Sequence, residues 1–369
     1  MKIGFLVNPV AGLGGKLGFK GTDGKDILEK VKALKAEPIA TKRAIEALME
    51  LKRNLDYFEL ITYPYEMGFY EAKEVGIEAK VVGQIKDRFN TTAEDTKRAV
   101  REFLKLKVDL ILFAGGDGTA RDLILAGVKG EPCLGIPAGV KIYSSCFAFN
   151  PREAGLLASK FLKGEVSCSD AEVLDIDEQA YRDGRLKVRL FGYLKTPYHE
   201  EAIQPSKSFT LLDEDELSNL EAIAKYVIEN MEEDTIYILS AGNTVKVIAD
   251  KLGIDKTPLG VDLILKKKLI ERDANEEIIL NKIRGKKAKI IVSPLGNQGF
   301  IFGRGNQQIS DKVIKQVGKE NIIVIASHRK LSKLKELRVD TGNSNLDEKL
   351  KGHIRVITDY NYEEVKPLV

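Results

Sequence analysis

The stretch Asp109–Asp122, DLILFAGGDGTARD, decides the fold of this chain. Its apolar run Leu110–Phe113 is too short to span a membrane and is bounded by glycines, which predicts a buried β-strand. The turn GGDGT at residues 115–119 follows, and its glycines allow backbone conformations that a Cβ excludes. Thr119 is expected to cap the next helix, whose free N–H groups would then favour a phosphate. The carboxylate of Asp117 suits a base, an acceptor for a hydroxyl group or a ligand of Mg²⁺.

Length and composition restrict the class of protein. A chain of 369 residues suggests about two domains. Because 58 basic residues nearly balance 55 acidic ones, at a net charge of +3, no nucleic-acid or membrane partner is predicted. The start of the chain runs directly into a strand pattern, so we expect no secretory leader, and the three cysteines show no metal or disulfide spacing. We therefore expect buried free thiols and a cytoplasmic location.

Strand and helix patterns alternate through the first part of the chain, which predicts right-handed βαβ units. The apolar run KIGFLV at 2–7 is typical of a buried parallel strand. We predict an α/β protein with an N-terminal parallel-sheet domain over 1–150 and a mixed α/β domain over 151–369. The second domain is expected to contain an antiparallel hairpin that turns at Asp183-Gly184. We also consider a return of its last strand, near 354–358, to the first domain.

A glycine-rich loop follows the first strand, at the end where open α/β sheets bind ligands. The loop matches neither G-x-x-x-x-G-K-[ST] nor G-x-G-x-x-G, because Leu17 stands where the last glycine would be. A flexible surface loop is the alternative interpretation. The residues expected to bind a nucleotide or phosphate here are Asn8, Gly12, Gly14 and Gly15.

Further polar turns follow later strands and are predicted to join the same site. Lys141 could neutralise phosphate charge, although a solvated lysine at a helix start is the alternative. Arg304 could bind a phosphate through two hydrogen bonds, and amides near it suit ribose or base recognition, unless the segment is only a glycine-rich hairpin. The other residues assigned to the nucleotide or phosphate in these turns are Gly242, Asn243, Thr244, Gln298 and Asn306.

The turn GGDGT between a strand and a helix resembles the signature of the NAD kinase and diacylglycerol kinase superfamily. The longer pattern NPVAGLGG…KGTDG resembles the branch of predicted ATP- or polyphosphate-dependent NAD kinases of archaea and of bacterial acetoin-degradation genes. Two features depart from ordinary NAD kinases. The motif N-E-[ND] is missing, since Asn275-Glu276 is followed by Glu277, and the second half is not all-β.

The resemblance implies a kinase that transfers a phosphoryl group from ATP or polyphosphate, with Mg²⁺, to the ribose 2′-hydroxyl of NAD. It assigns Asp117 to the acceptor hydroxyl, as the catalytic residue, or to the metal. The backbone of the turn would cradle phosphate oxygens at Gly115, Gly116, Gly118 and Thr119. Two alternatives stay open: a kinase for a polyol, keto-alcohol or lipid head group, and a nucleotide-binding regulator without turnover. We expect a small-molecule substrate, with NAD favoured, and a homo-oligomer.

Overall fold

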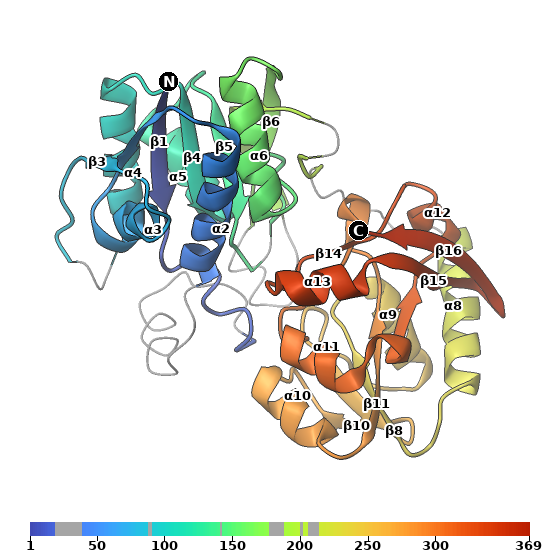
Figure 1. Cartoon of the computed structure of the whole chain (residues 1–369). Helices are drawn as coiled ribbons and strands as arrows, with labels where there is room; N and C mark the ends of the chain where they lie inside the picture. Colours follow the sequence, from blue (N-terminus) through green and yellow to red (C-terminus); the bar gives the residue numbers. More distant parts are fainter. Residues whose placement is uncertain (19–38, 88–90, 141, 177–187, 200–201, 206–213) are drawn as a thin grey trace. The chain divides into compact units, whose positions relative to one another are not determined.

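The computed structural model describes residues 1–18, 39–87, 91–140, 142–176, 188–199, 202–205 and 214–369. The chain folds into two compact units (Figure 1). Unit 1 comprises Met1–Leu13 and Gly21–Lys207, and unit 2 comprises Gly14–Lys20 and Ser208–Val369. Each unit has its own central sheet.

Unit 1 is built on a five-stranded sheet in the order β3-β2-β1-β4-β5. Every pairing in it is parallel, which confirms the predicted parallel sheet. The strands are β1 (Lys2–Val7), β2 (Glu59–Thr62), β3 (Ala79–Val81), β4 (Leu110–Gly115) and β5 (Cys133–Pro137). All six residues of β4 are buried, as its apolar run requires.

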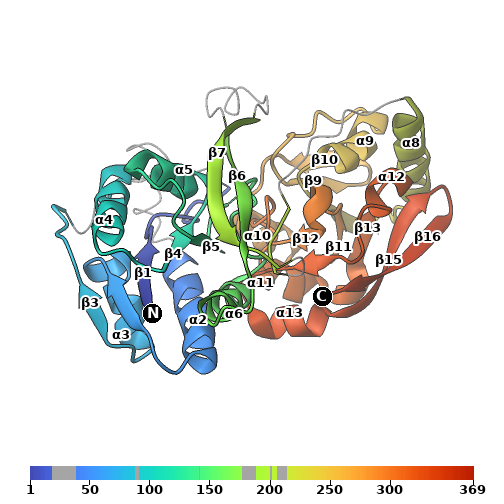
Figure 2. The same cartoon turned by 90° about the horizontal axis from the view of Figure 1, so that it is seen from above.

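Helices cover both faces of this sheet, and each buries one apolar stripe against it. Figure 2 shows α4 and α5 on one face and α2, α3 and α6 on the other, in agreement with two separate apolar cores. The helix bounds are α2 (Ile39–Asn54), η1 (Tyr65–Met67), α3 (Phe69–Glu74), α4 (Ala93–Lys105), α5 (Asp117–Ala126) and α6 (Pro151–Leu162). Caps define their starts. Asn150, for example, accepts the backbone N–H of Glu153 at 2.9 Å to begin α6.

An antiparallel hairpin, β6 (Cys168–Ile176) with β7 (Val188–Pro197), completes unit 1. Its inner residues Ala171, Val173 and Leu194 share an apolar core with Leu123 of α5. Because the hairpin packs there, contacts divide the chain after residue 207, whereas the pattern-based boundary lay at 150. The antiparallel hairpin is confirmed, but its predicted turn at Asp183-Gly184 lies outside the described residues.

Unit 2 has a mixed seven-stranded sheet in the order β10-β9-β8-β11-β13-β15-β16. Its middle strands β8, β11, β13 and β15 run parallel, and β9, β10 and β16 are antiparallel to their neighbours. The strands are β8 (Thr235–Leu239), β9 (Asp262–Leu265), β10 (Lys268–Glu271), β11 (Lys287–Val292), β13 (Ile322–Ile325), β15 (Gly352–Asp359) and β16 (Tyr362–Leu368). The chain's last strand thus pairs with β15 inside unit 2.

A small parallel pair and six α-helices surround this sheet among the described residues. The pair joins β12 (Phe300–Phe302) to β14 (Arg338–Val339). The helices are α8 (Glu214–Glu229), α9 (Asn243–Lys251), α10 (Glu276–Ile283), α11 (Asp311–Val317), α12 (His328–Leu331) and α13 (Ser344–Leu350), with short turns η2 (Gly296–Gln298) and η3 (Lys319–Asn321). One apolar core lies under α8 and α9, and another under α10, α11 and α13. Among all helices that the structure describes, none is long and apolar enough to cross a membrane.

Candidate active site

The site begins at the carboxyl edge of the unit 1 sheet, between β1 and β4. From β1 the chain passes to β2 and β3 on one side, and from β4 it passes to β5 on the other. Ligands of open α/β sheets bind where such connections diverge. Asn8, just after β1, donates from Nδ2 to Thr119 Oγ1 at 2.9 Å, and its backbone N–H bonds the carbonyl of Ala114. The predicted loops after β1 and β4 therefore meet at this point.

The glycines of the turn after β4 are required by close packing. A Cβ at Gly115 would lie 2.4 Å from the hydroxyl of Thr119, and one at Gly116 would lie 3.1 Å from Cα of Gly139. Gly116 is the N-cap of α5, and Gly118 lies in its first turn. The predicted cap, Thr119, instead lies inside the helix. Its N–H bonds the carbonyl of Gly116 at 2.9 Å, because the helix begins three residues earlier than expected.

The turn after β5 closes against the other two. The backbone N–H groups of Ala138 and Gly139 both donate to the carbonyl of Gly115, at 2.8 and 3.0 Å. Gly12 has φ +78°, and a Cβ there would come within 2.1 Å of the carbonyl oxygen of Ala138. Arg43 of α2 is buried and donates to the carbonyl of Pro137 at 3.0 Å. Three strand ends are thus fixed together around the GGDGT turn.

Asp117 is held more tightly than its sequence context indicates. Only 8 % of it is exposed. Its Oδ2 accepts the N–H of Tyr143 at 2.9 Å, and its Oδ1 accepts both the N–H and the hydroxyl of Ser144, at 3.0 and 2.6 Å. The hydroxyl of Ser144 in turn accepts the N–H of Leu174 in β6 at 3.0 Å. Asp117 therefore fixes the segment after β5 and, through Ser144, the hairpin.

A second buried carboxyl of unit 1, Glu71 in α3, carries no signal in the sequence. It has no solvent exposure, and Thr41 donates to its Oε1 at 2.9 Å, while Oε2 finds no hydrogen-bond partner among the described residues. Burial raises its pKa from 4.5 to about 7. Between these values the folded state binds the proton that the unfolded state has lost. The free energy of unfolding therefore falls as the pH rises from 4.5 through 7.

The other predicted site residues are distributed unevenly. Lys141 lies outside the described residues. Gly14 and Gly15 group with unit 2, where a Cβ at Gly15 would meet the amide of Gln307 at 2.2 Å. At the carboxyl end of β8, Gly242 caps α9, and Asn243 and Thr244 begin it.

Arg304, Asn306 and Gln298, three other predicted site residues, are buried inside unit 2. Arg304 is 3 % exposed, and its guanidinium forms an internal ion pair with Asp340 at 2.7 Å. Its assignment to a phosphate stays a prediction. Asn306 fixes its own turn by accepting the N–H of Gly303 and donating to the carbonyl of Ile301. Gln298 is 2 % exposed within η2.

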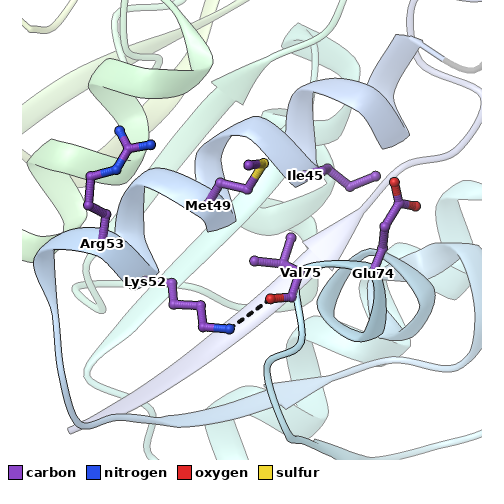
Figure 3. Close-up of a pocket in the computed structure, with 6 residues that line it drawn as sticks. All are labelled: Ile45, Met49, Lys52, Arg53, Glu74 and Val75. Carbon is purple, nitrogen blue, oxygen red and sulfur yellow. Dashed lines mark hydrogen bonds between the residues drawn. The ribbon is translucent and has the colours of Figure 1, made fainter.

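Unit 1 also has a surface pocket of about 510 Å³ that no residue of these turns lines (Figure 3). It lies between α2 and α3 and is lined by Ile45, Met49, Lys52, Arg53, Glu74 and Val75. Its lysine, Lys52, donates to the carbonyl of Val75 at 2.8 Å and so closes the end of α3. None of these six residues is one of the predicted site residues.

Family models assign this fold and its glycine turn to a class of protein, the α/β phosphotransferases that act on a hydroxyl acceptor. Residues 3–166 match the ATP-NAD kinase N-terminal domain, and residues 232–367 match the ATP-NAD kinase C-terminal domain. The chain belongs to the NAD kinase family, which supports phosphorylation of NAD to NADP. No curated protein and no solved structure matches it.

The two matches also bear on the departures seen in the sequence. The mixed α/β second half is itself matched by the family's C-terminal domain, so it does not remove the chain from the family. Asn275, of the incomplete N-E-[ND] motif, caps α10 by accepting the N–H of Ile278 at 2.9 Å. The archaeal and acetoin-associated branch, the homo-oligomer and the cytoplasmic location stay predictions.

Proposed function

We propose that the chain transfers the terminal phosphoryl group of ATP to the 2′-hydroxyl of the adenosine ribose of NAD, with polyphosphate as the second candidate donor. The observation that carries this proposal is the GGDGT turn at the point where the connections of β1 and β4 diverge, with Asp117 at the start of α5. Phosphoryl transfer depends mainly on positioning and on charge stabilisation, which such a turn can provide.

In this proposal Asp117 accepts the hydrogen bond of the acceptor hydroxyl and takes its proton. The hydrogen bonds from Tyr143 and Ser144 fix the direction of the carboxylate, which is what a positioned base requires. Phosphate oxygens would approach the turn at Gly116 and Gly118, where no Cβ projects. Asn8 would help to hold the same phosphate, because its amide already lies against Thr119.

Mg²⁺ fits this site as an ion shared with the nucleotide. In the described part of the chain, no three His, Cys, Asp or Glu side chains gather into a metal cluster. Mg²⁺ commonly uses one or two carboxylates together with substrate phosphates, so the single carboxylate of Asp117 would serve as its protein ligand. When bound, the ion would neutralise charge on the transferring phosphoryl group.

The test is a coupled assay of the purified full-length protein. Mg-ATP and polyphosphate are each offered with NAD, NADH and a panel of diols, and NADP or NADPH is detected enzymatically. Formation of NADP that disappears on chelation of Mg²⁺ is expected. Phosphorylation of a diol without any NADP would replace NAD as the acceptor, and no turnover together with tight nucleotide binding in a thermal-shift titration would favour the regulator.

A further inference from the structure

Three polar side chains gather at the carboxyl edge of the unit 2 sheet. β8, β11 and β13 are parallel neighbours, so their carboxyl ends lie at the same edge. Thr244 follows β8 in the first turn of α9, Ser293 directly follows β11, and Lys330 lies in α12 after β13. The ammonium group of Lys330 is 2.9 Å from Ser293 Oγ and 3.3 Å from Thr244 Oγ1.

The strand order places these residues at a second divergence of connections. From β8 the chain continues through α9 to β9 on one side, and from β11 it continues to β13 on the other. Thr244 and Ser293 therefore follow the two strands that flank this divergence, and Lys330 reaches both. The same topological rule that selects the GGDGT turn in unit 1 selects this cluster in unit 2.

The backbone at this edge leaves room for a ligand. Gly242, the N-cap of α9, has φ +117°, and a Cβ there would meet no atom within 4 Å. Being a glycine, it offers no side chain to cap the first N–H groups of a nine-residue helix. An ammonium group, two hydroxyls and helix N–H groups are all hydrogen-bond donors, and a phosphate supplies the matching acceptor oxygens.

Lys256, in the same unit, shows what a structural lysine looks like here. It is 1 % exposed, donates to the carbonyls of Thr257 and Gly260, and lies 3.4 Å from Asp262 Oδ2. Lys330 is instead half-buried, and the two hydroxyls beside it can themselves donate to an anion. This difference in burial favours ligand binding over internal support for Lys330.

We propose that unit 2 carries a phosphate-binding site of its own, formed by Lys330, Ser293 and Thr244, which takes a phosphate group of a nucleotide. The inference rests on the proposed function only for the identity of the nucleotide. The phosphate could belong to the donor or to the dinucleotide. Since hydrogen bonds to a charged group contribute about 1.5–3 kcal/mol, loss of the ammonium group should weaken binding about 10- to 100-fold.

The experiment is calorimetric titration of the full-length protein with inorganic tripolyphosphate, without Mg²⁺ and without NAD. Lys330→Met keeps the length of the side chain and removes its charge, and Ser293→Ala removes one hydroxyl. Lys268→Met is the matched control, because Lys268 is exposed and pairs with Leu265 at the opposite edge of the same sheet. Circular dichroism melts verify that each variant folds. Titrations with ATP and with NADP then identify the ligand whose phosphate depends on Lys330.

We expect at least tenfold weaker tripolyphosphate binding for Lys330→Met, a smaller loss for Ser293→Ala and no change for Lys268→Met. Wild-type affinity in both site variants, an equal loss in the control, or no binding by the wild-type protein would overturn the proposal. The outcome is separable from the NADP assay. If Lys330→Met weakens tripolyphosphate binding but the wild-type protein forms no NADP, this inference stands and the proposed function fails. If NADP forms and Lys330→Met binds tripolyphosphate as the wild-type protein does, the proposed function stands and this inference fails.

Discussion

Replacement of Asp117 by asparagine is expected to reduce both turnover and stability. The carboxylate presents acceptors on two sides: Oδ1 receives two donors of Ser144, and Oδ2 receives the N–H of Tyr143. An asparagine has only one carbonyl oxygen. If it retains the contacts to Ser144, its NH₂ group must face the N–H of Tyr143, so one hydrogen bond becomes a contact between two donors.

The stability loss follows from that single contact. A hydrogen bond to a charged group contributes about 1.5–3 kcal/mol, and an unsatisfied buried N–H costs a similar amount, so we expect about 3 kcal/mol. Unit 1 contains about 200 residues. For a unit of that size each kcal/mol shifts Tm by roughly 2–4 °C, which gives a decrease of roughly 6–12 °C. If Asp117 is also the base, kcat should fall by about 10²- to 10⁴-fold.

Differential scanning calorimetry and steady-state kinetics separate the two effects when Ser144→Ala is measured alongside. That variant removes the hydroxyl contact and the acceptor of the Leu174 N–H, but it keeps the carboxylate and both backbone bonds. It should therefore lose about 1–3 kcal/mol of stability while kcat stays within about tenfold. Near-wild-type turnover of Asp117→Asn would remove Asp117 from the mechanism. An equal loss of kcat in both variants would reduce Asp117 to a support for the 143–144 segment, and an unchanged Tm would refute the hydrogen-bond reasoning.

Three further substitutions test the structure around the site. Gly12→Ala should destabilise unit 1 by about 2 kcal/mol more than Gly164→Ala in chemical denaturation, because both have positive φ but only Gly12 lies against the backbone of Ala138; equal losses would contradict the packing. In the wild-type protein, the free energy of unfolding should decrease by up to about 3 kcal/mol between pH 4.5 and 7, and Glu71→Gln should abolish this decrease. Urea titration at several pH values measures it. The same dependence of unfolding free energy on pH in both proteins would exclude Glu71 as its source. Lys256→Met should lower the free energy of unfolding by about 3–5 kcal/mol, because it leaves the buried carboxylate of Asp262 without its cationic partner. A thermal melt identical to that of the wild-type protein would disprove the buried pair.

Local sequence patterns predicted most of the fold for a physical reason. Apolar runs such as Leu110–Phe113 become buried strands because a parallel sheet covered on both faces has no polar side. The GGDGT turn was recognisable because part of it is set by a local contact, that of Gly115 with Thr119, although Gly116 is limited by Gly139, outside the motif. The boundary near residue 150 was harder to place, because the hairpin resembles a new domain in sequence. It joins unit 1 through tertiary contacts, namely its packing on α5 and the hydrogen bonds of β6 to Ser144 and Ser145.

The roles of individual polar residues depended on partners distant in the sequence. The glycine-rich segment around Arg304 predicts a phosphate ligand, but it gives no sign of the buried ion pair with Asp340, which follows α11 and β13 in the sequence. Asp117 reads as an isolated carboxylate, yet the segment after β5 returns to cover it. Tertiary contacts decide whether a polar side chain is buried and which residue it pairs with. Residue type and local spacing therefore predict which groups could bind or react, but not whether those groups lie at a ligand site or inside the protein.

Strand order is the property that turns a set of loops into a site. In unit 1 the connections diverge between β1 and β4, and in unit 2 they diverge between β8 and β11, although each pair of strands is far apart in the sequence. Glycine turns after β1, β4 and β8 are visible in the sequence, whereas the pairing of those strands is not. Lys330 has no glycine turn beside it and lies in a helix of four residues, so no local pattern selects it. Only the adjacency of β8, β11 and β13 brings its ammonium group to Ser293 and Thr244, and for that reason the phosphate site of unit 2 follows from topology rather than from a motif.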